Sequence, residues 1–162
     1  MKEFKIVPVI MALVLLLTPA TIRARTMLVA LPERAGTTIN LANPQSALIE
    51  EERVLTLQAG VNKIDFSWKG VRIDPDSIRL TPLTHPADVS LLSVSYPPGE
   101  AALVWDIGSR EAYEERVRIS YLLAGVDRLI TYKLSVDREE KTADFKSFLI
   151  LRNFSGEDFE RT

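Results

Sequence analysis

The chain has 162 residues, and its 20 Lys and Arg residues nearly balance its 22 Asp and Glu residues, for a formal net charge of -2. Because both signs are interspersed, the charge pattern favours no nucleic-acid partner. There is no cysteine, which excludes a disulfide framework, a thiolate metal site and the acylated cysteine of a bacterial lipoprotein. Stability must therefore come from packing alone.

Residues 1–24 have the order of a secretory signal peptide: a short charged start, an apolar run from Ile6 to Leu17, and a segment of small and polar residues. As a helix the run would be about 18 Å long, against roughly 30 Å of membrane hydrocarbon. We expect cleavage after Ala24 or Ala20 and export to the periplasm or beyond. The alternative is a retained inner-membrane signal anchor, which Arg23 and Arg25 just after the apolar run would favour.

The remaining residues alternate apolar and polar side chains in short runs separated by turn formers, which predicts an all-β fold of antiparallel strands. The clearest case is the stretch 63–68, where Ile64, Phe66 and Trp68 share one face. The segment 109–115 is the only plausible short helix. The expected strands are 26–31, 37–42, 47–58, 63–68, 77–83, 89–96, 101–107, 114–124, 128–137 and 143–153.

Two turn-rich segments predict hairpins. Residues 59–62 would join the strand 47–58 to the strand 63–68, and residues 124–127 would join the strands 114–124 and 128–137. The last strand, 143–153, is more continuously apolar, which suggests burial on both faces. Its apolar edge needs a pairing strand, and the expectation is that this strand lies beyond Thr162, so that the chain is a fragment.

Several strings carry a resemblance to a known family: RVRISYLLAG followed by RLITYKLSVD, the closing LRNFSGEDF, ALIEEERVLTLQAGVNKIDF and IDPDSIRL. Across most of residues 38–160 the chain resembles the front part of exported bacterial proteins that carry the domain of unknown function 4139, some of them described as mucoidy-inhibitor-like. The resemblance implies an N-terminal β-sandwich and the opening strands of a second β domain, with no mechanism. The expected divisions are a signal-peptide helix at 1–24, an immunoglobulin-like β-sandwich at 25–108, and a truncated second β domain at 109–162.

No residue combination predicts catalysis, a cofactor or a metal. The single histidine, His85, is expected on a surface loop, and the acidic clusters 50–52, 114–115 and 139–140 on solvated strand edges. Asp74 and Asp76 flank Pro75. Among the acidic residues they are the best candidates for a metal-binding or acid–base pair, although a role in capping a turn is favoured. Ser155 is expected to be a turn serine, since it lacks the context of a nucleophile elbow. Core packing is expected for the aromatic residues Trp68, Trp105, Tyr96, Tyr121 and Tyr132.

These patterns predict a non-enzymatic, exported cell-envelope protein with a binding or structural role. Its partner would be a protein or an envelope polymer, without nucleic acid, and with membrane contact only through the signal segment before cleavage. The oligomeric state stays open. One alternative is the N-terminal fragment of an envelope hydrolase whose active site lies further along the chain. Another is a self-assembling envelope component that donates its apolar final strand to the next subunit.

Overall fold

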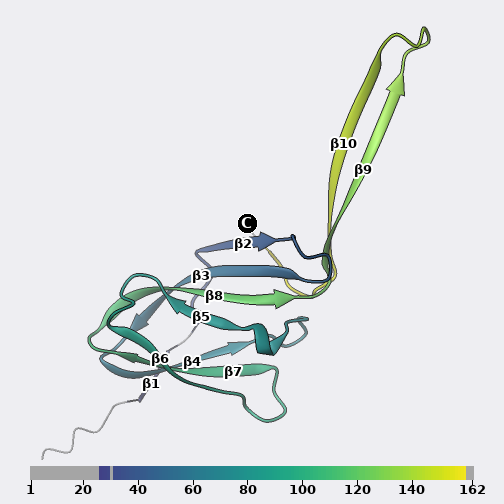
Figure 1. Ribbon diagram of the computed structural model, residues 1–162. Helices are drawn as coiled ribbons and strands as arrows, with labels where there is room; N and C mark the ends of the chain where they lie inside the picture. The colour runs from purple at the N-terminus through teal and green to yellow at the C-terminus, as the bar shows by residue number, and fades with distance from the viewer. Residues whose placement is uncertain (1–25, 30, 160–162) are drawn as a thin grey trace, which may run out of the picture.

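The structure is a computed structural model that describes residues 26–29 and 31–159. The predicted signal peptide at 1–24 lies outside these residues. The described chain is all-β, as expected, and its sandwich consists of two four-stranded sheets (Figure 1). The first sheet has the order β1 (Thr26–Val29), β4 (Gly60–Ser67), β7 (Ala102–Ser109), β6 (Val89–Ser95), and the second has the order β2 (Gly36–Asn40), β3 (Ala47–Leu57), β8 (Tyr113–Leu123), β5 (Arg79–Pro82).

The core lies between the two sheets and follows from the alternation of the strands. On β4, Ile64 and Phe66 point inward, and Trp68 just after the strand is also buried, as the sequence predicted. The ring of Phe66 lies 5.5 Å from that of Trp105 on β7 and 5.9 Å from that of Tyr121 on β8. Because β4 and β7 belong to one sheet and β8 to the other, this aromatic cluster joins the two layers.

The pairing of strands differs from the predicted hairpins. β3 and β4 belong to different sheets, so the connection between them, residues 58–59, carries the chain across the sandwich, and the predicted hairpin at 59–62 is wrong. β8 pairs with β3 and β5, not with the strand that follows it. β1 and β4 run parallel, an exception to the predicted antiparallel arrangement. Alternation determines which face of a strand is buried, but it does not identify the neighbouring strand.

The predicted helix at 109–115 and the predicted boundary at residue 108 are both wrong. Residues from Tyr113 onward form β8, which lies between β3 and β5 with its apolar residues in the core, so the sandwich extends to Leu123. Within the described residues the only helix is a short 3-10 turn, Pro75–Ser77 (η1), and no helix is long and apolar enough to cross a membrane.

The chain then forms a two-stranded antiparallel ribbon, β9 (Val126–Val136) and β10 (Ala143–Asn153), joined by a tip at residues 137–142. We call residues 126–153 the ribbon. It projects away from the sandwich, and the chain comes back to the sandwich after it (Figure 1). The expectation that 143–153 is buried on both faces is therefore wrong, since every residue of β10 is exposed.

Because β9 and β10 pair only with each other among the described strands, we expect the sandwich to fold without the ribbon. In a variant with residues 128–151 replaced by a short Gly-Ser turn, the near-ultraviolet circular dichroism of Trp68 and Trp105 should be unchanged. The unfolding midpoint in urea should stay close to that of the intact chain. A chain ending at residue 108, which lacks β8, should not fold. Loss of the tryptophan signal in the ribbon deletion would show that the ribbon is part of the folding unit.

Candidate binding surface on the ribbon

The pairing register sorts the ribbon's side chains onto two faces. Directly paired residues lie on the same face of an antiparallel pair, and the pairs Ile130 with Leu149 and Leu134 with Phe145 place four apolar residues together. We call this side of the ribbon the apolar face. Its seven large side chains are each 48% to 64% exposed, and they are Ile130, Tyr132, Leu134, Val136, Phe145, Leu149 and Leu151.

The opposite face is more polar toward the tip. Lys133 pairs with Lys146 and Ser135 with Asp144, and an ion pair of 2.9 Å joins Lys146 to Asp144. Nearer the sandwich this face carries a smaller apolar group, which consists of Leu129, Phe148 and Ile150. The ribbon is thus amphipathic over its outer half.

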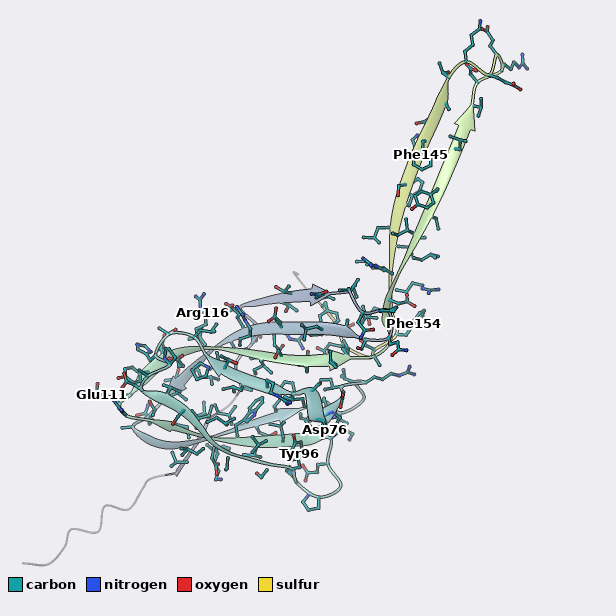
Figure 2. The ribbon with its side chains drawn as sticks, viewed as in Figure 1. Asp76, Tyr96, Glu111, Arg116, Phe145 and Phe154 are labelled. Carbon is teal, nitrogen blue, oxygen red and sulfur yellow. The ribbon has the colours of Figure 1, made fainter. Side chains whose placement is uncertain are left out.

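Within the part of the chain that the structure describes, no second layer covers the apolar face. A two-stranded ribbon cannot bury its own side chains between sheets, and such a ribbon is only marginally stable in water when isolated. The rings of Tyr132 and Phe145 stack at 5.6 Å with 17° between their planes, which makes a preformed aromatic platform. Figure 2 shows Phe145 partway along the ribbon, away from the sandwich. Exposed apolar patches of this size mark interaction sites.

Residues 124–125 and 154–159, which we call the root, join the ribbon to the sandwich through hydrogen bonds and ion pairs. Between β8 and β9 the Ala124 amide donates to the Arg72 carbonyl at 3.0 Å, and Gly125 adopts a positive φ of 87°. At the end of β10 the Phe154 amide donates to the Gly125 carbonyl at 2.7 Å. A Cβ at Gly125 would lie 2.9 Å from the Phe154 carbonyl oxygen. Glycine is therefore required by both the conformation and the space.

The segment that follows β10 returns the chain to the sandwich. Asn153 Oδ1 accepts hydrogen bonds from the Ser155 amide at 3.1 Å and the Ser155 hydroxyl at 2.7 Å. Ser155 is buried, and its carbonyl accepts from the Arg72 amide at 3.1 Å. Next to it, Gly156 has φ 86°, and a Cβ there would lie 2.4 Å from the Gly70 carbonyl oxygen. Ser155 is a turn serine, as predicted, with a structural role at the root.

Arg34 fixes this returning segment to the sandwich. Its guanidinium forms ion pairs with Glu51 on β3 and with Glu157, and donates at 3.1 Å to the Asp158 carbonyl. The Phe159 ring centre lies 5.9 Å from the guanidinium carbon. Burial alone would lower the pKa of Arg34, but the hydrogen bond to Glu157 and the charge of Glu51 outweigh it and raise that pKa well above its ordinary value.

Two carboxylates expected on solvated strand edges are instead fully buried. Glu51 pairs with Arg34 and, at 3.0 Å, with Arg53. Glu115 accepts hydrogen bonds at 2.8 to 2.9 Å from three successive backbone amides of the loop at 83–85 and lies 2.8 Å from His85 Nδ1. Sequence reasoning missed both because their partners are distant along the chain. The only local signal is that each glutamate alternates in step with the apolar residues on the buried face of its strand.

His85 lies on a loop, as predicted, but it is anchored there. Its ring stacks on Tyr113 at 4.2 Å between centres and contacts Glu115. The Asp74 side chain accepts from the Asp76 amide at 3.1 Å and caps the 3-10 turn, which confirms the capping role. Among the residues that the structure describes, no group of three or more His, Cys, Asp or Glu side chains is placed to hold a metal ion.

The aromatic candidates divide into two groups. Trp68, Trp105 and Tyr121 are buried, as expected. The expectation of core packing is wrong for Tyr96 and Tyr132, which are 51% and 64% exposed. Tyr132 belongs to the apolar face, whereas the Tyr96 hydroxyl donates to the Pro75 carbonyl at 3.4 Å. The exposed aromatic of interest is therefore Tyr132.

Comparisons with family models, with curated proteins and with solved structures find no match to this chain.

Replacing Arg34 by methionine should destabilise the root. The change leaves Glu51 with Arg53 as its remaining cation and frees Glu157, and we expect a loss of about 2 to 3 kcal/mol in unfolding free energy, since one partner of a largely buried pair is removed. Amides of residues 153–159 should exchange faster with solvent. Arg110→Met, which removes the exposed ion pair to Asp88, is the matched control and should change stability by less than about 0.5 kcal/mol. Equal effects of the two changes would contradict the proposed role of Arg34.

Two glycines with similar φ values test the packing of the root. Gly156→Ala combines an unfavourable φ with a collision against the Gly70 carbonyl, whereas Gly99→Ala has the unfavourable φ of 76° but nothing within 4 Å. We expect Gly99→Ala to cost about 1 kcal/mol from backbone strain, and Gly156→Ala to cost clearly more. Urea unfolding of the two variants measures the difference. A Gly156→Ala variant as stable as Gly99→Ala would show that the root accommodates the collision by moving.

Proposed function

We propose that this chain is an exported cell-envelope protein with a non-catalytic binding or structural role, and that the apolar face of the ribbon is its binding surface. The observation that carries the proposal is the group of seven large apolar side chains exposed on one face of a ribbon with an anchored root. Water contact with these side chains is unfavourable, at about 25 cal/mol for each Å² of apolar surface. Their burial by a partner therefore supplies a driving force for binding.

The chemistry of the face favours a protein partner over an envelope polymer. Between Ile130 and Val136 on β9, and between Ala143 and Leu149 on β10, the residues of this face carry no charge. Its hydroxyl groups are those of Tyr132 and Ser147. Polymers of sugars or phosphates present mainly polar groups, which such a face cannot satisfy. The apolar surface of another folded chain can pack against it without leaving polar groups unpaired.

The root supports a binding role because it limits the freedom of the ribbon. The hydrogen bonds at Gly125 and Ser155 and the ion pairs of Arg34 fix the two points where the ribbon meets the sandwich. A surface that is already ordered loses less conformational entropy when a partner binds. The predicted signal peptide at 1–24 supports export as the location.

Site-specific photo-crosslinking in cells tests this function. A photoreactive residue in place of Phe145 should give covalent adducts of the exported chain. The same residue in place of Glu114, which is exposed on β8 of the sandwich, is the control and should give few. Adducts should also fall when Leu134→Lys is added to the Phe145 probe, since a charge then lies beside it on the apolar face. Equal labelling from both positions, or none from position 145 in an exported and folded chain, would contradict the proposal.

A further inference from the structure

We infer that the partner of the apolar face is a second copy of this chain, whose ribbon packs antiparallel on the first, face against face. This inference rests on the proposed binding function and names the partner. Pairing along the ribbon edges, as in strand exchange, would extend the sheet but leave the apolar face uncovered. Only a second layer covers it.

The exposed area is sufficient for a stable dimer. Taken together, the seven side chains of the apolar face expose roughly 800 Å², which is what one partner contributes to an interface of standard size. Two of them, Tyr132 and Phe145, are aromatic and already stacked on each other. Aromatic residues near the centre of an interface contribute most of the binding energy.

The order of side chains along the ribbon is compatible with a two-fold axis. Beyond the root pair Val126–Asn153, where Val126 is buried, five cross-strand pairs line the apolar face toward the tip, and the pair Tyr132–Ser147 is the middle one. A two-fold axis that lies in the interface at this pair, perpendicular to the strands, places Ser147 of one copy opposite Ser147 of the other. The same axis sets Leu149 against Phe145 of the second copy, and Leu151 against Ala143. Apolar residues therefore meet apolar residues on both sides of the central Ser147, and Arg128 faces Val136 of the second copy at each end.

The distribution of charge is compatible with the antiparallel arrangement. The ribbon's only charge on this face is Arg128 at the root, paired across the strands with Leu151, and it forms no ion pair with any residue that the structure describes. The tip carries Glu139 and Glu140 beside Arg138 and Lys141, and Lys141 forms an ion pair of 2.9 Å with Glu139. An antiparallel packing brings the tip of one copy to the root of the other, and so brings Glu140 toward Arg128.

The length of the ribbon also favours the antiparallel arrangement. Eleven paired residues extend about 36 Å, which is similar to the diameter of a sandwich of about 100 residues. In the antiparallel arrangement the two sandwiches lie at opposite ends of the paired ribbons. In a parallel arrangement both would occupy the same end. An open groove of about 690 Å³, lined in part by Ile39, Leu151 and Phe159, lies at the root, at the end of the ribbon to which the antiparallel arrangement brings the tip of the second copy.

Because the chain contains no cysteine, single cysteines can report the geometry. In Ser147→Cys the two backbones should lie about 10 Å apart across the interface, as packed sheets do, with the thiols closer still, and a short bis-maleimide should link them into a dimer. In Ala143→Cys the thiols should be too far apart to be linked. Both substitutions are small and lie on the same strand. Linking at position 147 and not at position 143 supports the inference, and equal linking at both positions, or none at 147, overturns it.

Sedimentation velocity of the exported chain supplies the second measurement. The unmodified chain should be a dimer, and Phe145→Lys should raise the dimer dissociation constant by about 30-fold or more, as expected for loss of a central aromatic contact. Phe148→Lys, on the opposite face of the same strand, should leave the dimer intact. Near-ultraviolet circular dichroism of Trp68 and Trp105, both in the sandwich, verifies that each variant is folded.

The outcomes separate this inference from the proposed function. A chain that is monomeric when concentrated, but gives adducts with a different protein from position 145 in cells, would overturn the second copy as partner and leave the binding function standing. A monomer that gives no adducts from position 145 would overturn both. Adducts of twice the chain mass, together with a dimer in solution, support both.

Discussion

The Arg34 guanidinium holds the segment that follows the ribbon against the sandwich. Its two ion pairs join β3, through Glu51, to the returning chain, through Glu157. Charges buried in this way are costly unless they are paired, so loss of one partner leaves the other uncompensated. The root is therefore a point at which electrostatics, two glycines and a buried serine all fix the same short segment.

The sandwich buries its apolar side chains between two sheets, whereas the ribbon leaves those of one face exposed. In the sandwich, Phe66, Trp105 and Tyr121 of two facing sheets cover one another. In the ribbon, Tyr132 and Phe145 stack side by side on one face and no second sheet of the described chain covers them. The same alternation thus produces a core in one case and an exposed surface in the other. A partner that supplied the second layer would turn the ribbon into a small sandwich of its own.

Local patterns in the sequence identify which residues form strands, but they do not identify which strands pair with one another. The alternation at Ile64, Phe66 and Trp68 correctly identified a buried face. The turn at Gly125 looked like a hairpin, yet it is a bend between a sandwich strand and the ribbon, because β3 and β5 already flank β8. The continuous apolar run of β10 suggests burial, and no local signal reveals that a strand has only one neighbour and no covering layer.

The candidate site was predictable in part. The apolar character of residues 128–137 and 143–153 was visible in the sequence, as was the turn chemistry of Ser155. The burial of Glu51 was not, since it depends on Arg34 and Arg53, and that of Glu115 depends on amides of a loop 30 residues away or more. Such buried ions are defined by tertiary contacts, and a run of three glutamates on a strand normally indicates solvent exposure.

Hydrogen exchange of the ribbon amides at different protein concentrations tests the central claim most directly. If a second copy covers the apolar face, exchange across residues 130–136 and 143–149 should slow as the concentration rises, because dimer formation stabilises the ribbon by mass action. Exchange across β3 in the sandwich should not change. Ribbon amides that exchange at the same rate in dilute and concentrated solution would contradict the claim.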